Sequence, residues 1–536
     1  MASLISASDA VHWYMEELTS RIIAQSGIAS DRHHLGKVIL QSLKDAPDFV
    51  LQTDAATGKF ENFKSVFERS VKCAISLKKM GFKKGDVMVV MAPNHLDVSI
   101  VLYAALYLGM IVAGVDVGLE LLNEASLIFC QSTKMPVIRE ALYQIGLQAE
   151  IVTFDEGSHE KTFGKLLNEC GDVSFNNFKP EDFDPEETIA FLLCTSGTTG
   201  LPKAAALTHK NMILVLVDFS NFPTPTKLVL TTSPLQWLSA IFYQIFSPIL
   251  RFSRVQTSEV LTQERFTEIV NKYRPTYTLM SPTLMTSMIK PGVRGEVDLT
   301  CFEYVILGGS AVSTQLIDEV KVPPNLRLVV AYGCSEVGGL VLINGQHPAR
   351  GSIGKPIGLF DYRVNVATNE DIIEPHIKGE LWIKGPSVFK GYYNNPELTK
   401  ETLLDDGWLR TGDILYRDEH FNFYFVDRLK MLLKYKNHQI SPTELEEVIY
   451  QHPGVLHVAV TGIEDEECGD LPVACVVTKS GYDITAQEIK DLVKETLADS
   501  KQLRGGVIFM KELPLTASTK INRSKLKEIV KNMERQ

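Results

Sequence analysis

The sequence lacks the features that mark secreted and nucleic-acid-binding proteins. Its eight cysteines in 536 residues form no Cys-x-x-Cys pair, and several lie in apolar runs. This distribution favours reduced, buried thiols of an intracellular protein over a disulfide framework. Lys and Arg number 54 against 65 Asp and Glu, which gives a formal net charge of −11. General attraction to nucleic acid or to an anionic membrane is therefore not expected, and anionic ligands would need local basic patches.

Targeting signals and a membrane span are also missing. The N-terminus has no basic region followed by an apolar core, and the C-terminus reads Glu-Arg-Gln rather than Ser-Lys-Leu, so neither a secretory nor a peroxisomal address is expected. The one long uncharged run, 98–115, lies between Asp97 and Asp116 without basic anchors. We predict a buried helix up to Leu108 and then a strand at 110–115. The cytoplasm is the expected location.

The chain is long enough for two or three structural units. Apolar strand-like runs alternate with longer amphipathic stretches, which predicts an α/β architecture. The runs include 87–91, 188–194, 228–230, 304–307 and 328–330. From about Tyr362 short strands and turns predict a β-rich subdomain, and a smaller α+β unit is expected after Asp427. Within that unit, Ser441 followed by Pro442 predicts the start of a helix that carries 444–450.

A polar loop is expected at Thr195–Lys203, directly after the apolar run 188–194. It reads Thr-Ser-Gly-Thr-Thr-Gly-Leu-Pro-Lys. Glycines can expose backbone N–H groups to phosphate oxygens, and the hydroxyls add donors. The loop is not a Walker motif, because Leu201 and Pro202 separate the second glycine from Lys203. Taken alone such a run is more typical of a surface turn, and polyphosphate binding is the hypothesis that other segments must support.

The loop resembles the phosphate-binding signature of the adenylate-forming superfamily. This superfamily includes acyl-CoA synthetases, 4-coumarate-CoA-ligase-like enzymes, beetle luciferases and nonribosomal adenylation domains. Further segments follow in the order that the superfamily has: Ala-Tyr-Gly-Cys-Ser-Glu (331–336), Gly-Trp-Leu-Arg-Thr-Gly-Asp (407–413), Asp-Arg-Leu-Lys (427–430), Pro-Thr-Glu-Leu-Glu (442–446) and Pro-Leu-Thr-Ala-Ser-Thr-Lys-Ile-Asn-Arg (514–523). The resemblance covers nearly the whole chain and is strongest to the luciferase and 4-coumarate-CoA-ligase branch.

The resemblance implies two domains. Residues 1–426 would form a large N-terminal domain of α/β subdomains and a β-rich subdomain, which binds ATP and the acyl substrate. Residues 427–536 would form a small, mobile α+β lid after a hinge at Asp427–Lys430.

The resemblance also assigns roles to single residues. Lys520 would stabilise the charge on the phosphates while a carboxylate joins the α-phosphate of ATP and pyrophosphate leaves. Thr519 stands where the family has glycine, which reduces the backbone freedom around this lysine. Glu336 would bind Mg²⁺, Arg428 would contact ribose or phosphate, and Asp413 would accept from the ribose diol. Lys520, Arg428 and Glu336 are thus the implied catalytic residues.

The implied nucleotide site is larger than these residues. Tyr332 offers a ring for stacking on adenine, and the backbone at 308–310 would approach the base and the α-phosphate. The full set of expected ATP and AMP contacts is Thr195, Ser196, Gly197, Thr198, Thr199, Gly200, Lys203, Gly309, Ser310, Ala331, Tyr332, Gly333, Ser335, Asp413, Arg428 and Lys520.

The implied acyl pocket departs most from the luciferases. It would consist of Trp237, Ser239, Ala240, Gly308, Gly333, Gly339 and Leu340. Residues 236–240 read Gln-Trp-Leu-Ser-Ala where beetle luciferases have His-His-Gly-Phe-Gly, and Leu340 replaces a small alanine. Trp237, in the place of the second histidine, would shorten the pocket, gate it, or belong to the core.

The segment expected to approach CoA consists of Lys434, Lys436, Asn437 and Gln439. Asn437 stands where the family usually has glycine. Asparagine tolerates a positive φ better than most residues, so the shape of the loop is expected to survive.

The leading interpretation is an ATP-dependent acyl-CoA synthetase with ATP, Mg²⁺ and CoA, acting on a small-molecule fatty or aryl acid as a monomer or weak homodimer. It would form acyl-AMP, release pyrophosphate, and transfer the acyl group to CoA. The alternative is a luciferase that oxidises a luciferyl-adenylate with oxygen, since both chemistries share one ATP site. The missing histidine argues against beetle luciferin, but not against another luciferin. A third alternative is an inactive relative that binds a nucleotide or lipid.

Overall fold

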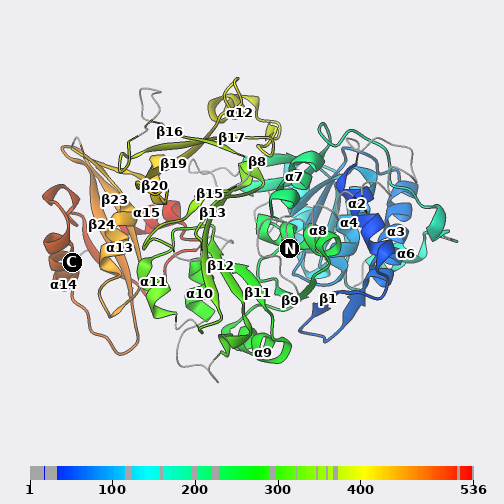
Figure 1. Ribbon diagram of the computed structural model, residues 1–536, viewed down its shortest axis with the longest axis horizontal. Coiled ribbons are helices and arrows are strands. Elements are labelled where there is room, and N and C mark those ends of the chain that lie inside the picture. The colour runs from blue at the N-terminus through cyan, green and yellow to red at the C-terminus, as the bar shows by residue number, and fades with distance from the viewer. Residues whose placement is uncertain are drawn as a thin grey trace, which may run out of the picture.

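The computed structural model describes residues 17–18, 33–114, 124–156, 161–172, 174–195, 203–219, 228–288, 297–320, 323–345, 348–357, 360–365, 372, 374–436, 438–515 and 520–533. Within these residues the chain forms sheets of nine, seven, four and five strands (Figure 1). Among the helices described, none combines the length and the apolar character that crossing a membrane requires. The mixed α/β architecture with a small C-terminal unit confirms the predicted fold class.

The seven-stranded sheet contains two strands that end and begin on either side of the expected phosphate loop, whose residues 196–202 lie outside the described part of the chain. Its order is β18-β8-β7-β4-β3-β5-β6, and its members are β3 (Val87–Met91), β4 (Ile111–Gly114), β5 (Ala125–Cys130), β6 (Glu150–Thr153), β7 (Ile189–Thr195), β8 (Lys203–Thr208) and β18 (Gly391–Tyr392). All five residues of β3 are buried, as its unbroken apolar run predicts for a central parallel strand. Helix α4 (Asp97–Leu108) ends at Gly109 with φ 70°, and β4 follows, which confirms the predicted buried helix and strand.

The nine-stranded sheet brings together segments more than 200 residues apart. Its order is β15-β14-β13-β12-β11-β9-β10-β1-β2, with β1 (Val50–Asp54), β2 (Phe60–Asn62), β9 (Leu228–Leu230), β10 (Ser253–Gln256), β11 (Tyr277–Met280), β12 (Tyr304–Gly308), β13 (Arg327–Cys334), β14 (Gly339–Ile343) and β15 (Lys355–Pro356). Strands β1, β9, β10, β11, β12 and β13 run parallel to their neighbours in that part of the sheet. The apolar runs predicted as strands at 228–230, 304–307 and 328–330 are confirmed within it.

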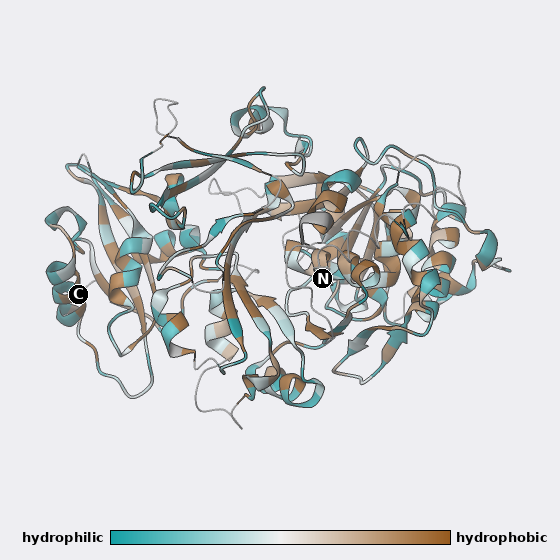
Figure 2. Cartoon of the chain, in the orientation of Figure 1, coloured by the Kyte–Doolittle hydropathy of each residue, from teal (hydrophilic) through white to brown (hydrophobic). Residues whose placement is uncertain are grey.

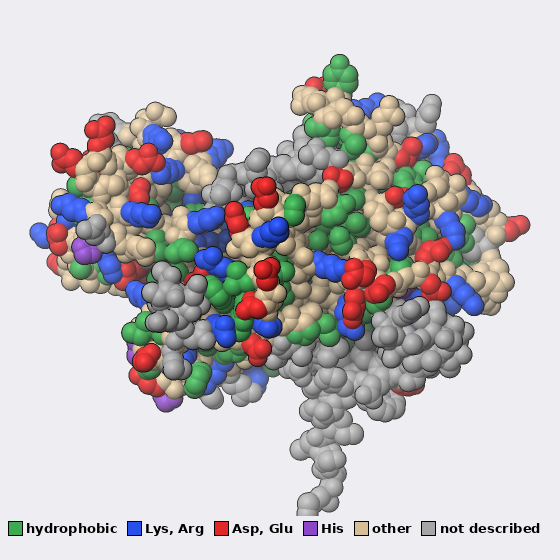
Figure 3. Space-filling view, turned by 90° about the horizontal axis from the view of Figure 1, so that it is seen from above, with side chains coloured by type: hydrophobic (Ala, Val, Ile, Leu, Met, Phe, Trp, Pro, Cys, Tyr) green, Lys and Arg blue, Asp and Glu red, His purple; other side chains and the backbone are tan. Residues whose placement is uncertain are grey.

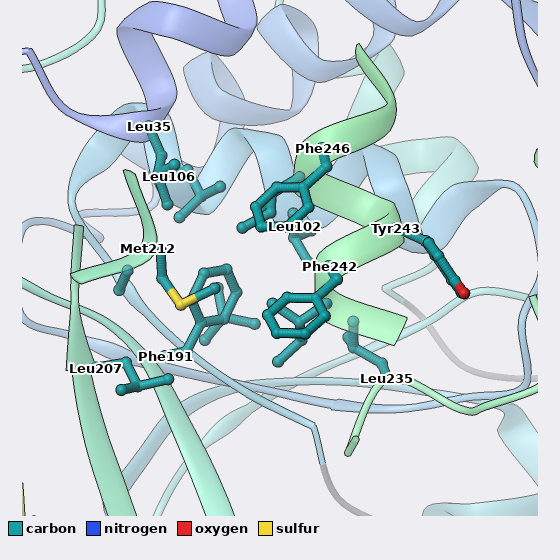
Figure 4. Packing of buried hydrophobic residues seen from close by; sticks show 14 of the residues in the cluster. Leu35, Leu102, Leu106, Phe191, Leu207, Met212, Leu235, Phe242, Tyr243 and Phe246 are labelled. Atoms are coloured by element: carbon teal, nitrogen blue, oxygen red, sulfur yellow. The ribbon is translucent and has the colours of Figure 1, made fainter. Parts of the chain in front are cut away.

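Helices join the two large sheets through one continuous core. Helix α2 (Leu35–Asp45) packs on α3 (Phe63–Lys79), α4 and α8 (Leu238–Leu250). Figure 4 shows Leu35, Leu106, Phe191, Phe242 and Phe246 of these elements and of β7 packed together. Figure 2 shows that hydrophobic residues concentrate in the strands of the large sheets and in the helices packed on them. The remaining N-terminal helices are α5 (Met135–Ile145), α6 (Phe163–Asn168), α7 (His209–Phe219), α9 (Gln263–Tyr273), α10 (Pro282–Met288) and α11 (Thr314–Glu319).

The β-rich subdomain predicted from about residue 362 is confirmed. It is a four-stranded antiparallel sheet with α12 (Pro396–Thr402) beside it, built from β16 (Asp361–Asn365), β17 (Gly379–Lys384), β19 (Leu409–Arg417) and β20 (Phe423–Arg428). Strand β20 lies at one edge of this sheet, and the short helical turn Leu429–Met431 connects it to the C-terminal unit.

The C-terminal unit is a small α+β fold with its own core. Its strands are β21 (Leu433–Tyr435), β22 (His438–Ile440), β23 (Val455–Asp465), β24 (Gly469–Thr478) and β25 (Gly506–Phe509), and its helices are α13 (Pro442–Ile449), α14 (Ala486–Thr496) and α15 (Arg523–Lys531). The Ser441 hydroxyl accepts from the Glu444 backbone N–H at 3.1 Å, which confirms the predicted helix start. The exact domain boundary and the hinge at Asp427–Lys430 stay predictions.

Candidate active site

A cavity of about 740 Å³ lies where both large sheets, the four-stranded sheet and the C-terminal unit meet. Strands β12, β13 and β14 supply one wall, and β19 and β20 supply another. Acidic and basic side chains are interspersed over the face of the molecule in Figure 3.

Ten of the expected nucleotide contacts have described side chains, and the structure brings eight of these to this cavity together with Glu336, whereas Tyr332 does not line it. Its lining includes Lys203, Gly309, Ala331, Gly333, Ser335, Glu336, Asp413, Arg428 and Lys520. Ser310 lines an adjoining cavity between the N-terminal part and the C-terminal unit. Ser196, Gly197, Thr198, Thr199 and Gly200 lie outside the described residues. Thr195 is the last residue of β7, and its side chain is likewise outside the described part.

Asp413 is buried at one side of the cavity and contacts two polar side chains there. Tyr332 Oη donates to Asp413 Oδ2 at 2.6 Å, and Arg428 Nε lies 3.1 Å from Asp413 Oδ1. The antiparallel register of β19 and β20 sets Asp413 directly opposite Arg428. Burial raises the pKa of Asp413, although the Arg428 charge and the Tyr332 hydrogen bond oppose that shift. The carboxylate is thus held dry and oriented, an arrangement suited to a diol.

Lys520 reaches the same cavity from the C-terminal unit. Burial lowers its pKa to about 8, and the nearby Arg428 charge adds to the shift, whereas Asp413 and Glu336 oppose it. Asn522, two residues after the lysine, is held in place: its backbone N–H donates to the Pro514 carbonyl at 2.8 Å, and its side chain caps α15. The cluster of Lys520, Arg428, Asp413 and Glu336 is therefore formed in this structure.

Glu336 has a neighbour that the sequence did not indicate. Tyr392 Oη donates to Glu336 Oε1 at 2.7 Å, and Lys203 Nζ lies 5.4 Å from the centroid of the Tyr392 ring. Burial lowers the pKa of Lys203, and the positive charge of Lys430 adds to that effect. Tyr392 comes to the site because β18 pairs with β8. Its uncharged segment, next to Tyr393 and a turn, carried no signal of a site residue.

The side of the cavity where the acyl group is expected is mostly apolar. Of the expected residues, Trp237, Ser239, Gly308, Gly333, Gly339 and Leu340 line it, whereas Ala240 is 1% exposed and does not. The sequence did not single out further lining residues, namely Leu238, Phe242, Leu261, Leu279 and Leu284. A Cβ atom at Gly333 would lie 2.3 Å from the Gly339 carbonyl oxygen, so the close pairing of β13 and β14 requires glycine there.

The residues expected to contact CoA lie elsewhere. Lys434 and Gln439 are exposed on the β21–β22 hairpin, and Lys436 at its turn has a φ of 49°. The Lys436 backbone N–H donates to the Cys468 carbonyl at 2.7 Å. Asn437 lies outside the described residues. None of the described members of this set lines the cavity.

Comparison with known proteins decides the family. Residues 41–393 match the AMP-binding enzymes, and residues 444–520 match the C-terminal domain of AMP-binding enzymes. The chain belongs to the AMP-binding enzyme family. This adenylate-forming enzyme is 32% identical over 510 residues to the luciferin 4-monooxygenase of Photuris pensylvanica, covering 91% of this chain and 93% of that protein.

Coenzyme A ligases are among the relatives of this AMP-binding enzyme as well. It is 30% identical to a probable CoA ligase of Humulus lupulus, over 93% of this chain and 91% of that one. Its fold matches an anthranilate CoA ligase in complex with anthranoyl-AMP, with a TM-score of 0.85, 20% identity, and coverage of 94% and 98%. The relatives of this AMP-binding enzyme therefore include both luciferases and CoA ligases.

Proposed function

We propose that this AMP-binding enzyme is an AMP-forming acid–CoA ligase for an apolar carboxylic acid. The observation that carries the proposal is the cluster of Lys520, Arg428, Asp413 and Glu336, in which Asp413 is buried and which adjoins an apolar pocket in the same cavity. Cationic groups that are already held in place in a cavity stabilise developing phosphate charge without a cost of reorganisation. The CoA ligases among the relatives support the same chemistry.

In the first step, a carboxylate oxygen of the acid attacks the α-phosphorus of ATP. A bond forms between them, the bond from the α-phosphorus to the bridging oxygen breaks, and pyrophosphate leaves. Lys520 contacts the oxygens that gain charge, Arg428 contacts the phosphate, and Asp413 accepts from the ribose hydroxyls. Glu336 offers the hard carboxylate oxygen that suits Mg²⁺, and the ion would neutralise phosphate charge when bound. Lys203 adds a further cation at the same wall.

In the second step, the CoA thiolate attacks the acyl carbon and AMP leaves. We infer that the segment of Lys434, Lys436, Asn437 and Gln439 serves this step after the C-terminal domain, 427–536, turns about Asp427–Lys430. In the present arrangement Lys434, Lys436 and Gln439 are exposed and outside the cavity, which is the reason that a turn is required.

A luciferase is the second candidate, because luciferin 4-monooxygenases are prominent among the relatives. It would share the first step and then oxidise the adenylate with oxygen. Trp237 replaces the histidine of the beetle pocket, so beetle luciferin is the less suitable acid for this cavity.

The test is a panel of fatty, aryl and luciferin-like acids. AMP and pyrophosphate release are measured with and without CoA, and light is recorded in parallel. The proposal expects pyrophosphate with a matching acid, and AMP together with an acyl-CoA once CoA is added. Light with a luciferin-like acid would support the second candidate. Pyrophosphate release from no acid would overturn both and leave a nucleotide- or lipid-binding relative.

A further inference from the structure

Trp237 lines the cavity, and hydrogen bonds hold its backbone in place. It is the N-cap residue of α8: its N–H donates to the Pro234 carbonyl at 3.0 Å, and its carbonyl accepts from Ala240 N–H at 3.0 Å. Strand β4 packs directly against this turn, since a Cβ atom at Gly114 would lie 2.6 Å from the backbone nitrogen of Gln236. The backbone that carries the indole is therefore held in place.

The ring of Trp237 faces a charge from the other domain. Lys520 Nζ lies 5.7 Å from the indole centroid, within the range of a cation–π interaction. Both side chains line the cavity. The negative face of an aromatic ring attracts and stabilises a poorly hydrated ammonium.

We propose that Trp237 is a positioning residue that holds the Lys520 ammonium at the acyl side of the cavity. The inference rests on the proposed function and deepens it. One side chain then forms the wall of the acyl pocket and sets the place of the adenylating lysine. An acid that does not fit beside the ring shifts the lysine as well, so acid selectivity and adenylation rate change together at this position.

A replacement series separates this role from simple packing. Trp237→Phe keeps an aromatic face, whereas Trp237→Leu keeps apolar volume without one. We expect Trp237→Leu to lower pyrophosphate release about tenfold and Trp237→Phe to lower it less than about threefold. Thioester formation from preformed acyl-adenylate should fall less than adenylation in both variants. Melting temperatures control for folding. Equal losses for Leu and Phe would overturn the proposal.

A double-mutant cycle with Lys520→Ala tests the pairing itself. If the ring acts through the lysine, Trp237→Leu should have little further effect on adenylation once Lys520 is removed, because the shared interaction is already lost. The same fold-loss in both backgrounds would show that Trp237 acts independently of Lys520.

Tryptophan emission tests the contact without any substrate, so it stays informative if the chain adenylates no acid. The chain has four tryptophans. Lys520→Ala should change the emission of the wild-type chain, and this change should disappear in the Trp237→Phe background. Lys520→Arg, which keeps a cation, should change the emission less than Lys520→Ala. If Lys520→Ala changes the emission equally in the wild-type and Trp237→Phe backgrounds, Lys520 does not contact the Trp237 ring.

Discussion

Two lysine-bearing segments of the C-terminal unit differ sharply in their surroundings. Lys520, just before α15, is half-buried and lines the cavity together with Arg428 and Asp413. Lys434 and Lys436, on the β21–β22 hairpin of the same unit, are exposed and outside it. A rigid domain can present only one of these segments to the cavity at a time. Under the proposed function, this arrangement would serve adenylation and a second one would present the hairpin lysines to CoA.

Electrostatics gives the comparison a physical reason. During adenylation the phosphates carry charge that a buried ammonium can stabilise. Once pyrophosphate has left, a lysine held at the α-phosphate has lost much of that task, while the anionic CoA must reach the acyl carbon. In the proposed mechanism, the domain turn withdraws Lys520 from the cavity after adenylation and brings Lys434 and Lys436 toward the CoA.

The largest expected effect is the removal of Lys520. Lys520→Ala should lower adenylation by on the order of 10²-fold or more, as when a preorganised charge contact is lost. With preformed acyl-adenylate and CoA, the variant should form thioester at close to the parent rate. Pyrophosphate release and acyl-CoA formation measure the two steps separately. Lys531→Ala, an exposed lysine at the end of α15, is the matched control. Equal losses in both steps would make Lys520 structural.

Asp413 should affect both steps, because the ribose is present throughout. Asp413→Ala should weaken ATP binding and retention of the acyl-adenylate by about 10- to 100-fold, the loss of hydrogen bonds to a charged acceptor. Isothermal titration with ATP and with the adenylate measures each affinity. A change in only one of the two affinities would contradict the ribose assignment.

The hairpin lysines should give the reverse of the Lys520 result. Replacing Lys434 and Lys436 together by alanine should lower thioester formation about tenfold by weakening an exposed charge contact to CoA, and should leave pyrophosphate release unchanged. The KM for CoA should rise at low salt more than at high salt. If this variant also loses pyrophosphate release, Lys434 and Lys436 are not specific to the thioester step, which contradicts the proposed division of roles.

The smallest effect is a pH dependence of the first step. Because burial lowers the pKa of Lys520 to about 8, its ammonium loses the proton as pH rises through that value. The kcat/KM of adenylation for ATP reports the free enzyme and should fall about threefold between about pH 7.5 and about pH 8.5. Lys520→Arg should abolish this fall in kcat/KM, since a guanidinium stays charged over this pH range. If the fall persists in the arginine variant, another group titrates.

Much of this fold could be predicted where local sequence is decisive. The unbroken apolar run at 87–91, the helix that ends at Gly109 and the Ser441 cap each act within a few residues, and all three are confirmed. The motifs around Glu336 and Asp413 predicted residues that the structure places in one cavity.

What could not be predicted depends on long-range pairing. Tyr392 reaches Glu336 only because β18 pairs with β8, almost 190 residues earlier in the chain. Ala240 is buried on α8 and does not line the cavity. Which face of α8 meets the core depends on packing against distant elements, and the local sequence does not encode it. Which lysine segment faces the cavity depends on domain orientation, which the local sequence does not encode.

Locking the two domains tests the central claim most directly. Thr314 Oγ1 on α11 donates to Glu447 Oε1 on α13 at 3.4 Å, across the two domains. A reversible cross-link between Thr314→Cys and Glu447→Cys would hold the present arrangement, with the two single variants controlling for the native thiols. We predict that the locked chain still releases pyrophosphate for one turnover but forms no acyl-CoA until the link is reduced. Undiminished acyl-CoA formation by the locked chain would contradict the account.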